Sequence, residues 1–456
     1  MAASKTPVQS GTTATATGMP TKKLFIDTLV RDIDLAASIV DLVDNCIDGA
    51  KRLRPNGKFK GLKVDIKLNA DKFSVIDNCG GIDVDVAEHY AFRFGRDDVH
   101  NAQVKHSVGH FGVGMKRTLF KIAKSFSITS VAKRSRFELH LDVHKWQADK
   151  TNWDFPLTKV KRSETNAVGA TGTKIVVTSL RPEIAEEFDI SKFQDDIRER
   201  IEIAHGFAIN AGLEIHFNGE LLEAEELCIR ASPKLKPLLK SGTFHVGPSA
   251  EKVTYDLIAG VDGRDSDDSG WYVFCNGRLL LRADQTKITG WGEPPAPKHH
   301  QQFNYFRGYL FLEADNAGLL PWNTTKTSVS EDSEIYRRIV IEMASAIKSV
   351  TLLLNKVRDE DKLPAGSRTP LTAMIESAKQ YDATDVIKVR AISAATFTWP
   401  SVSAGAKRDV GKKRITYVVD SEIYDRVRRR LKATSAEMVG SGTFDYFVEA
   451  ELGDEV

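Results

Sequence analysis

Asp77 lies where a predicted strand runs into a glycine-containing loop. The strand ends at Ile76, and the loop continues through Gly80 and Gly81 to Ile82. Backbone without side chains can approach a flat ligand closely, and a carboxylate can accept a hydrogen bond from an exocyclic amine. The segment therefore suits recognition of a flat ligand that carries an exocyclic amine, although an ordinary β-turn has the same composition.

A second glycine-rich segment, Gly-His-Phe-Gly-Val-Gly at 109–114, precedes a predicted helix. Its bare amides and the helix N-terminus can hold phosphate oxygens, and Lys116 and Arg117 add positive charge. A P-loop is excluded, because Gly114 is followed by Met115 rather than by Lys and Ser or Thr. A dinucleotide fingerprint is excluded as well. That motif has glycines at relative positions one, three and six, whereas the glycines of this segment stand at positions one, four and six.

A third polar group lies earlier in the chain. Asp41, Asn45 and Asp48 are spaced i, i+4 and i+7, so they project from one face of a predicted helix. A solvated face of an amphipathic helix looks the same, and this group alone does not define a site.

The elements that must position these residues alternate between helices and strands. The first region is predicted to contain a helix over 32–52, a hairpin of strands 62–68 and 73–76, a helix over 112–123, and strands at 126–131, 137–143 and 174–178. These elements form a two-layer α/β unit with a mostly antiparallel sheet. The second region is predicted to be α+β, with a helix over 191–203, strands at 214–217, 253–258, 270–281 and 308–313, and a long helix over 331–357.

Composition narrows the class of protein. The 456 residues include 64 Lys and Arg against 62 Asp and Glu, a formal charge of +2 that gives no overall attraction to nucleic acid or anionic membrane. The four cysteines form no CxxC pair, which argues against a zinc site or a disulfide framework. The sequence shows neither a run of 18 apolar residues nor a secretory signal, so we expect a cytoplasmic protein without a membrane partner.

Four segments together resemble the ordered boxes of the GHKL superfamily: Asp41-Leu-Val-Asp-Asn45-Cys-Ile-Asp48-Gly-Ala, Asp77-Asn-Cys-Gly-Gly81, Gly109-His-Phe-Gly-Val-Gly114 and Gly172-Thr173. That superfamily includes DNA gyrase, the mismatch-repair clamp ATPases, the large heat-shock chaperone, the microrchidia ATPases and the sensor histidine kinases. The resemblance implies a Bergerat-type fold that binds ATP with Mg2+ and hydrolyses the nucleotide.

The resemblance also implies a role for each position. Asp41 is the general base or water-orienting acid, Asn45 the magnesium ligand, and Asp77 the acceptor of the adenine amino group, with Gly81 close to the base and Thr173 supporting Asp77. Residues 93–110 form the lid over the nucleotide. The remaining predicted nucleotide-binding positions are Asp48, Ile82, Gly109, His110, Phe111, Gly112, Val113, Gly114, Met115 and Lys116.

Two departures from the family pattern leave alternatives open. Asp41 stands where the family has glutamate, and its side chain is shorter by roughly 1.5 Å, one carbon–carbon bond. Slow turnover, or a nucleotide-dependent interaction module without turnover, is therefore an alternative to an efficient ATPase. Cys79 replaces the first glycine of its box, where it is expected to pack rather than react.

The second region resembles a transducer domain through Phe274-Cys-Asn-Gly-Arg278. In such proteins a lysine on a transducer loop reaches the terminal phosphate. Lys326 is the preferred candidate and Lys287 the competitor. The resemblance implies a nucleotide-driven conformational switch in which two chains, an ATP-dependent homodimer, clamp an unnamed protein or nucleic-acid client; a DNA-acting clamp is the alternative. About forty residues precede Asp41 and contain no phosphoacceptor hairpin, which argues against a sensor kinase.

The predicted organisation is a flexible tail at 1–20, a GHKL domain at 21–185, a transducer-like domain at 186–357, a linker at 358–370 and a C-terminal unit at 371–456. In that unit, Arg414–Val419 alternates as a strand, 421–431 is predicted to be a basic helix, and a further helix starts at Ser435. A nucleic-acid module, a dimerisation module and a solvated helix face all fit this pattern.

Overall fold

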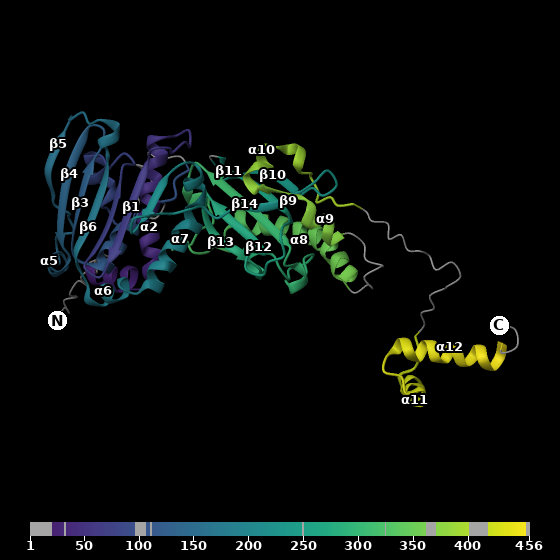
Figure 1. The fold of residues 1–456 in the computed structure, drawn as a ribbon. Helices are drawn as coiled ribbons and strands as arrows, with labels where there is room; N and C mark the ends of the chain where they lie inside the picture. The colour runs from purple at the N-terminus through teal and green to yellow at the C-terminus, as the bar shows by residue number, and fades with distance from the viewer. Residues whose placement is uncertain are drawn as a thin grey trace, which may run out of the picture. The chain divides into compact units, whose positions relative to one another are not determined.

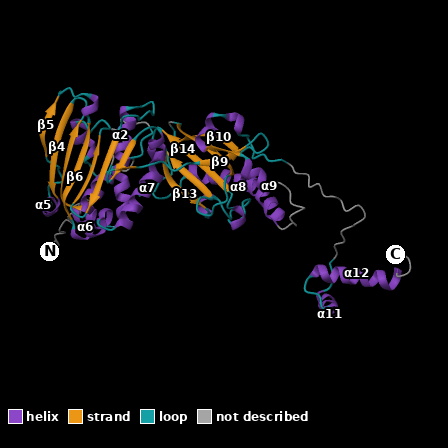
Figure 2. Ribbon diagram, viewed as in Figure 1, coloured by secondary structure: helices purple, strands orange, loops and turns teal. Residues whose placement is uncertain are grey.

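The computed structural model describes residues 21–31, 33–95, 106–109, 112–248, 250–323, 325–361, 371–400 and 418–452. They divide into two compact units at residue 400. Helices and mixed sheets make up both regions of the first unit, which confirms the predicted α+β class (Figures 1 and 2). In the part of the chain that is described, no helix is both long and apolar enough to cross a membrane.

An eight-stranded sheet forms the first region. Its spatial order is β5-β4-β3-β6-β2-β1-β7-β8, and neighbouring strands are antiparallel except β1 and β7. The strands are β1 (Lys63–Asn69), β2 (Lys72–Asp77), β3 (Ala123–Val131), β4 (Ser135–Asp142), β5 (Leu157–Arg162), β6 (Gly172–Leu180), β7 (Glu214–Phe217) and β8 (Glu220–Leu221).

Helices pack on this sheet and on one another. Helix α2 (Leu35–Leu53) lies between α4 (Gly114–Ile122) and α7 (Ser191–Asn210) and also contacts β2. Asp34 caps α2, because its carboxylate accepts a hydrogen bond of 2.8 Å from the amide of Ala37. The shorter helical segments of the region are α1 (Lys22–Leu24), a π-helical turn (Phe25–Val30), α3 (Val84–Val86), a π-helical turn (Ala87–Ala91), α5 (Val143–Ala148) and α6 (Pro182–Phe188).

A five-stranded sheet of order β10-β11-β14-β12-β13 forms the second region. Its strands are β10 (Leu238–Val246), β11 (Glu251–Val261), β12 (Gly270–Cys275), β13 (Arg278–Asp284) and β14 (Phe306–Ala314), and α8 (Glu334–Asp361) packs against β11. The prediction of a single strand over 270–281 was wrong. Asn276 and Gly277 both have positive φ, as the two central residues of a tight hairpin turn require, and they reverse the chain between β12 and β13.

Two predicted boundaries differ from the structure. The sequence placed 214–217 in the second region, but β7 pairs with β1 in the first sheet, and α7 packs against α2. The sequence also started the C-terminal unit at 371. Instead, β15 (Lys379–Asp382) pairs with β9 (Cys228–Ala231), and α9 (Leu371–Ser377) and α10 (Ala383–Lys388) also belong to the first compact unit. These contacts join segments distant in sequence, which local patterns do not reveal.

The second compact unit contains α11 (Ser421–Leu431) and α12 (Ala436–Leu452), as the helical periodicity predicted. The predicted strand at Arg414–Val419 lies largely outside the described residues, and Val418 and Val419 have no regular secondary structure. The predicted tail at 1–20 also lies outside them. In the predicted linker, 358–361 form the end of α8 and the remainder is not described.

Candidate functional site

The polar side of α2 is buried. Asp41, Asp44 and Asp48 are among the buried residues of the helix, whereas Asn45 between them is exposed. A solvated helix face would leave the carboxylates in water, so that interpretation does not hold here. Burying carboxylates costs free energy unless each finds a partner, and the partners of these residues define the site.

Asp41 has two cationic neighbours. Arg117, the fourth residue of α4, donates a hydrogen bond to Asp41 Oδ2, and both side chains are almost fully buried. On the other side, the Nζ of Lys326 lies 3.4 Å from Oδ1. Oδ1 is buried and accepts no hydrogen bond from the described residues. The chain therefore anchors one oxygen of this carboxylate and leaves the other with an unused acceptor.

Asp44 is the centre of a second cluster. Its carboxylate accepts hydrogen bonds from Arg278, at the start of β13, and from Lys326, whose Nζ lies 2.6 Å from Oδ2. The Nε2 of His205 on α7 lies 3.4 Å from Oδ1. Burial alone would raise the pKa of Asp44, but the charges of Arg278 and Lys326 outweigh it and lower that pKa. Asp44 is therefore held as the anion.

Lys326 joins the two clusters, because its single ammonium group reaches both Asp41 and Asp44. It lies in the loop between β14 and α8, and its φ of +53° is unusual for a residue with a side chain. Such backbone geometry persists where the surroundings enforce it. The competitor Lys287 lies elsewhere, with its ammonium 3.4 Å from Glu293 and its side chain 73% exposed.

The remaining residues of the predicted metal and lid region have distinct partners. The Nδ2 of Asn45 donates a hydrogen bond of 3.0 Å to the carbonyl oxygen of Asp41. Asp48 accepts hydrogen bonds of 2.7 Å from the backbone amides of Val108 and Gly109. The observed role of Asp48 is thus to fasten the end of the predicted lid to α2.

Asp77 ends β2 beneath the glycine loop. Its Oδ1 accepts hydrogen bonds from the backbone amides of Cys79, at 2.7 Å, and Thr173, at 3.3 Å. The thiol of Cys46 lies 3.6 Å from Oδ2. Burial raises the pKa of Asp77, while the two amide hydrogen bonds oppose that shift. The predicted support of Asp77 by Thr173 corresponds to a backbone hydrogen bond rather than to the threonine hydroxyl.

Two glycines beside Asp77 allow the backbone to pack closely. A Cβ on Gly172 would overlap the carbonyl oxygen of Asp77, and a Cβ on Gly81 would overlap that of Val131. Gly81 also has φ of +68°, which glycine adopts without strain. The amide of Ile82 donates a hydrogen bond of 2.6 Å to the hydroxyl of Ser130. These contacts hold the loop against β3 and β6.

The predicted phosphate loop is described in part. Gly112 has φ of +66°, Val113 precedes α4, and Gly114 begins that helix close to the carboxylate of Asp41. Met115 follows within the same helix. His110 and Phe111 lie outside the described residues, as do 96–105 of the predicted lid.

Lys116 does not face an open site. Its side chain is buried, and its Nζ donates a hydrogen bond of 2.9 Å to the carbonyl oxygen of Ala91. The sequence suggested that Lys116 and Arg117 place positive charge near phosphate. Instead, the ammonium of Lys116 points into the protein, and the guanidinium of Arg117 binds Asp41.

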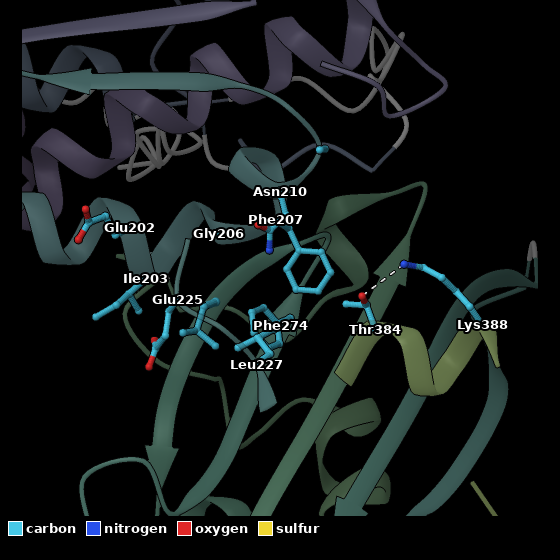
Figure 3. Close-up of a pocket in the computed structure, with 12 residues that line it drawn as sticks. Glu202, Ile203, Gly206, Phe207, Asn210, Glu225, Leu227, Phe274, Thr384 and Lys388 are labelled. Carbon is cyan, nitrogen blue, oxygen red and sulfur yellow. Dashed lines mark hydrogen bonds between the residues drawn. The ribbon is translucent and has the colours of Figure 1, made fainter. Parts of the chain in front are cut away.

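Two cavities lie beside α7 rather than beside Asp41 and Asp77. One, of about 280 Å³, is lined by Phe207, Phe274 and Leu227, with Thr384 and Lys388 at one side (Figure 3). The ring centroids of Phe207 and Phe274 are 5.0 Å apart, so these side chains pack together. The other, of about 240 Å³, includes Lys51 and Arg278 in its wall. Among the residues that the structure describes, none of the predicted nucleotide-binding positions lines either cavity.

A family model described as "Histidine kinase-, DNA gyrase B-, and HSP90-like ATPase" matches residues 33–173. The matched segment extends from the start of α2 into β6 and contains all four sequence boxes. These residues form a GHKL-type ATPase domain, which confirms the predicted superfamily. No curated protein matches the chain.

Sequence reasoning missed Asp44, His205 and Arg278, and treated Arg117 only as nearby positive charge. Asp44 lies in the first GHKL box and Arg278 in the transducer-like motif, and 234 residues separate them. The available signal for Asp44 was its place on the same polar side of α2 as Asp41 and Asp48. No local pattern indicates that Arg278 and Lys326 meet it.

Proposed function

We propose that the chain binds ATP with Mg2+ on its GHKL-type domain and hydrolyses it. The observation that supports hydrolysis is the Asp41 carboxylate, with Oδ2 held by Arg117 and Oδ1 buried without a hydrogen bond from the described residues. Such an acceptor gains free energy when a donor reaches it. In this role, Asp41 accepts a hydrogen bond from the attacking water and orients that water toward the terminal phosphate.

Asp77 is proposed to recognise the base. The backbone amides of Cys79 and Thr173 both bind Oδ1, so Oδ2 is the oxygen that can accept from the adenine amino group. Gly81 keeps the adjacent backbone free of side-chain atoms. The amides of Gly112 and Gly114 are proposed to bind the phosphates at the start of α4. The amide of Gly109, which the sequence assigned to the same role, instead donates its hydrogen bond to Asp48.

The side chain of Asn45 is suited to bind a magnesium ion. Its amide nitrogen is fixed to the carbonyl of Asp41, so the amide oxygen is the end of this exposed side chain that can bind a cation. One amide oxygen, together with phosphate and water oxygens, is a ligand set typical of Mg2+. When bound, the ion supplies charge neutralisation for the phosphates. Asn45 would hold it beside the carboxylate that orients the water.

Lys326 is proposed to couple the nucleotide to the second region. Its ammonium lies at 3.4 Å from Asp41 and 2.6 Å from Asp44, on a loop directly before α8. A terminal phosphate beside Asp41 would compete with these carboxylates for the ammonium. The bound or hydrolysed state of the nucleotide would thus set the position of the loop and of α8, which makes the protein a conformational switch.

Phosphate release from Mg-ATP by the purified full-length chain tests this function. We expect slow release by the wild type, faster release by Asp41→Glu and none by Asp41→Ala, with binding heat retained in all three. Binding heat without release by the wild type would instead indicate an interaction module without turnover. Absence of binding heat would refute nucleotide binding itself.

We further propose that ATP brings the GHKL-type domains of two chains together around a client, with DNA as the alternative to a protein client. Cross-linking between these domains should increase with a non-hydrolysable ATP analogue and not with ADP. Equal cross-linking in both states would contradict a nucleotide-dependent clamp. Nucleotide-dependent retention of duplex DNA on a filter would favour the DNA-acting alternative.

A further inference from the structure

Helix α12 of the second compact unit is drawn in yellow in Figure 1. Several of its large apolar side chains are exposed. Phe444, Phe447 and Tyr446 are 55%, 56% and 71% exposed, and Met438 and Leu452 are also exposed. Apolar residues occur on every side of the helix, and Phe444 and Phe447 share a face because they are three residues apart. A helix that is apolar all round is normally surrounded by protein.

The described part of this unit does not supply that surrounding. Over 418–452, only Ala433 and Val439 are buried. The contact between the two helices is formed on one side of α12, where Gly442 lies against Leu431 of α11. Two helices with so small a core cannot offset the entropy of ordering their backbone, and units of this size usually need a partner.

The charges of the two helices are complementary. Within α12, every charged residue is acidic: Glu437, Asp445, Glu449 and Glu451. The last turns of α11 and the residue that caps it are basic, with Arg426, Arg428, Arg429, Arg430 and Lys432. The Nε of Arg428 donates a hydrogen bond to the carbonyl oxygen of Ala433. Among the described residues of this unit, α11 and α12 form no ion pair with each other. The acidic helix and the basic helix thus remain open to partners of opposite charge.

We propose that this unit is a homodimerisation site at which a second copy of the chain covers α12. A two-fold interface places each surface patch against its counterpart, so the basic α11 of one chain can meet the acidic α12 of the other twice. Phe444 and Phe447 fill the centre of the interface and the charged pairs surround it. This dimer forms without nucleotide and does not depend on the function proposed above.

Light scattering on the full-length chain without nucleotide gives the first test. The expected mass is twice the chain mass of 50.5 kDa. The double variant Phe444→Glu with Phe447→Glu should raise the dissociation constant at least a hundredfold, because it places charges at the apolar centre. As a matched control, Ile341→Glu changes a 66% exposed apolar residue of α8 in the same way and should leave the dimer intact.

Charge reversal gives a second test that is independent of apolar contacts. One variant carries Arg426→Glu and Arg430→Glu on α11, and the other carries Asp445→Lys and Glu449→Lys on α12. Each should be monomeric alone, because like charges meet at both contacts. A mixture of the two should restore dimers containing one copy of each, since both contacts then join opposite charges.

Three outcomes would overturn the proposal. The first is a monomeric wild-type chain at micromolar concentration, and the second is a dimer that survives the double phenylalanine variant. The third is a pair of charge-reversed variants that fail to associate while the wild type dimerises. Loss of DNA retention in the α11 variant, with the oligomeric state unchanged, would assign the basic helix to nucleic acid instead. Each variant is checked for an unchanged thermal transition of the first unit.

Discussion

Lys326 and Asp44 form a buried ion pair between residues 282 positions apart in the sequence, with Nζ 2.6 Å from Oδ2. The same ammonium lies 3.4 Å from Asp41. Because α2 carries both carboxylates and the loop before α8 carries the lysine, displacement of either element breaks contacts of the other. Together with the bond from Arg278 to Asp44, this pair links the GHKL-type domain to the second region.

Replacement of Lys326 by methionine should abolish phosphate release and spare nucleotide binding. The free energy of unfolding should also fall. Breaking a buried ion pair typically costs about 3–5 kcal/mol, and we expect a smaller loss here because Arg278 still neutralises Asp44. Lys287→Met is the matched control, since Lys287 is a mostly exposed side chain outside the site. Turnover and thermal unfolding are measured for both. Normal turnover by Lys326→Met would remove its assigned role.

Arg117 is expected to hold Asp41 in position. Arg117→Met leaves a buried carboxylate without its main hydrogen-bond donor, which should lower the free energy of unfolding by about 3–5 kcal/mol. Adding Asp41→Leu should recover much of that loss while the protein stays inactive, because an apolar pair carries no charge to desolvate. Chemical denaturation of the four proteins in this double-mutant cycle gives the coupling. Additive losses would mean that the two residues do not act as a pair.

Asp77→Asn should weaken ATP binding about ten- to a hundredfold, as expected for a lost hydrogen bond to a charged group. The side-chain oxygen of the new asparagine still accepts hydrogen bonds from the backbone amides of Cys79 and Thr173. Its NH2 group then takes the place of Oδ2, so a donor instead of an acceptor faces the adenine amino group. Burial raises the pKa of Asp77, so its charge costs free energy in the folded protein. The variant should therefore unfold at the same or a higher temperature. A lower unfolding temperature with unchanged affinity would contradict this.

Gly81→Ala tests the close approach of the loop to β3. Gly57→Ala is its control, because Gly57 has φ of +69° but no atom within 4 Å of an added Cβ. Both variants carry the left-handed backbone cost of about 1–2 kcal/mol. Only Gly81→Ala must also displace the carbonyl of Val131. We expect a clearly larger loss of stability for Gly81→Ala, together with weaker ATP binding, and equal losses would refute the close-approach argument.

His205 should make stability pH-dependent. Burial lowers its pKa from the ordinary value of 6.5 to about 3, so the unfolded chain binds a proton that the folded chain rejects. Above pH 6.5 the imidazole is neutral in both the folded and the unfolded chain and costs no stability. As the pH falls from 6.5 toward 3, only the unfolded chain takes up the proton, so the free energy of unfolding decreases by up to about 1.4 kcal/mol per pH unit. His205→Gln should show a shallower decrease over this window in denaturation experiments. If stability fell equally steeply with pH in both proteins, His205 would not be the source of the pH dependence.

Local patterns predicted the elements that form the site. The apolar periodicity of α2, the alternation of β1 and β2, and the glycines before α4 all depend on neighbouring residues. Strand β5 was missed because it is an edge strand with mostly exposed side chains and no buried alternation. The inward orientation of Lys116 and the meeting of Asp44 with Arg278 depend on packing between distant segments. The nucleotide roles assigned to Asp41, Asn45 and Asp77 stay predictions.

The parallel pairing of β7 with β1 decides how the GHKL-type domain can be isolated for biochemistry. A fragment that stops near residue 185 lacks β7 and leaves β1 as an unpaired edge, with Val64 and Ile66 in a strand that invites aggregation. The amide of Leu222 closes this edge through its hydrogen bond to Ile215. A truncated protein intended for calorimetry or crystallisation should therefore extend at least to Leu222.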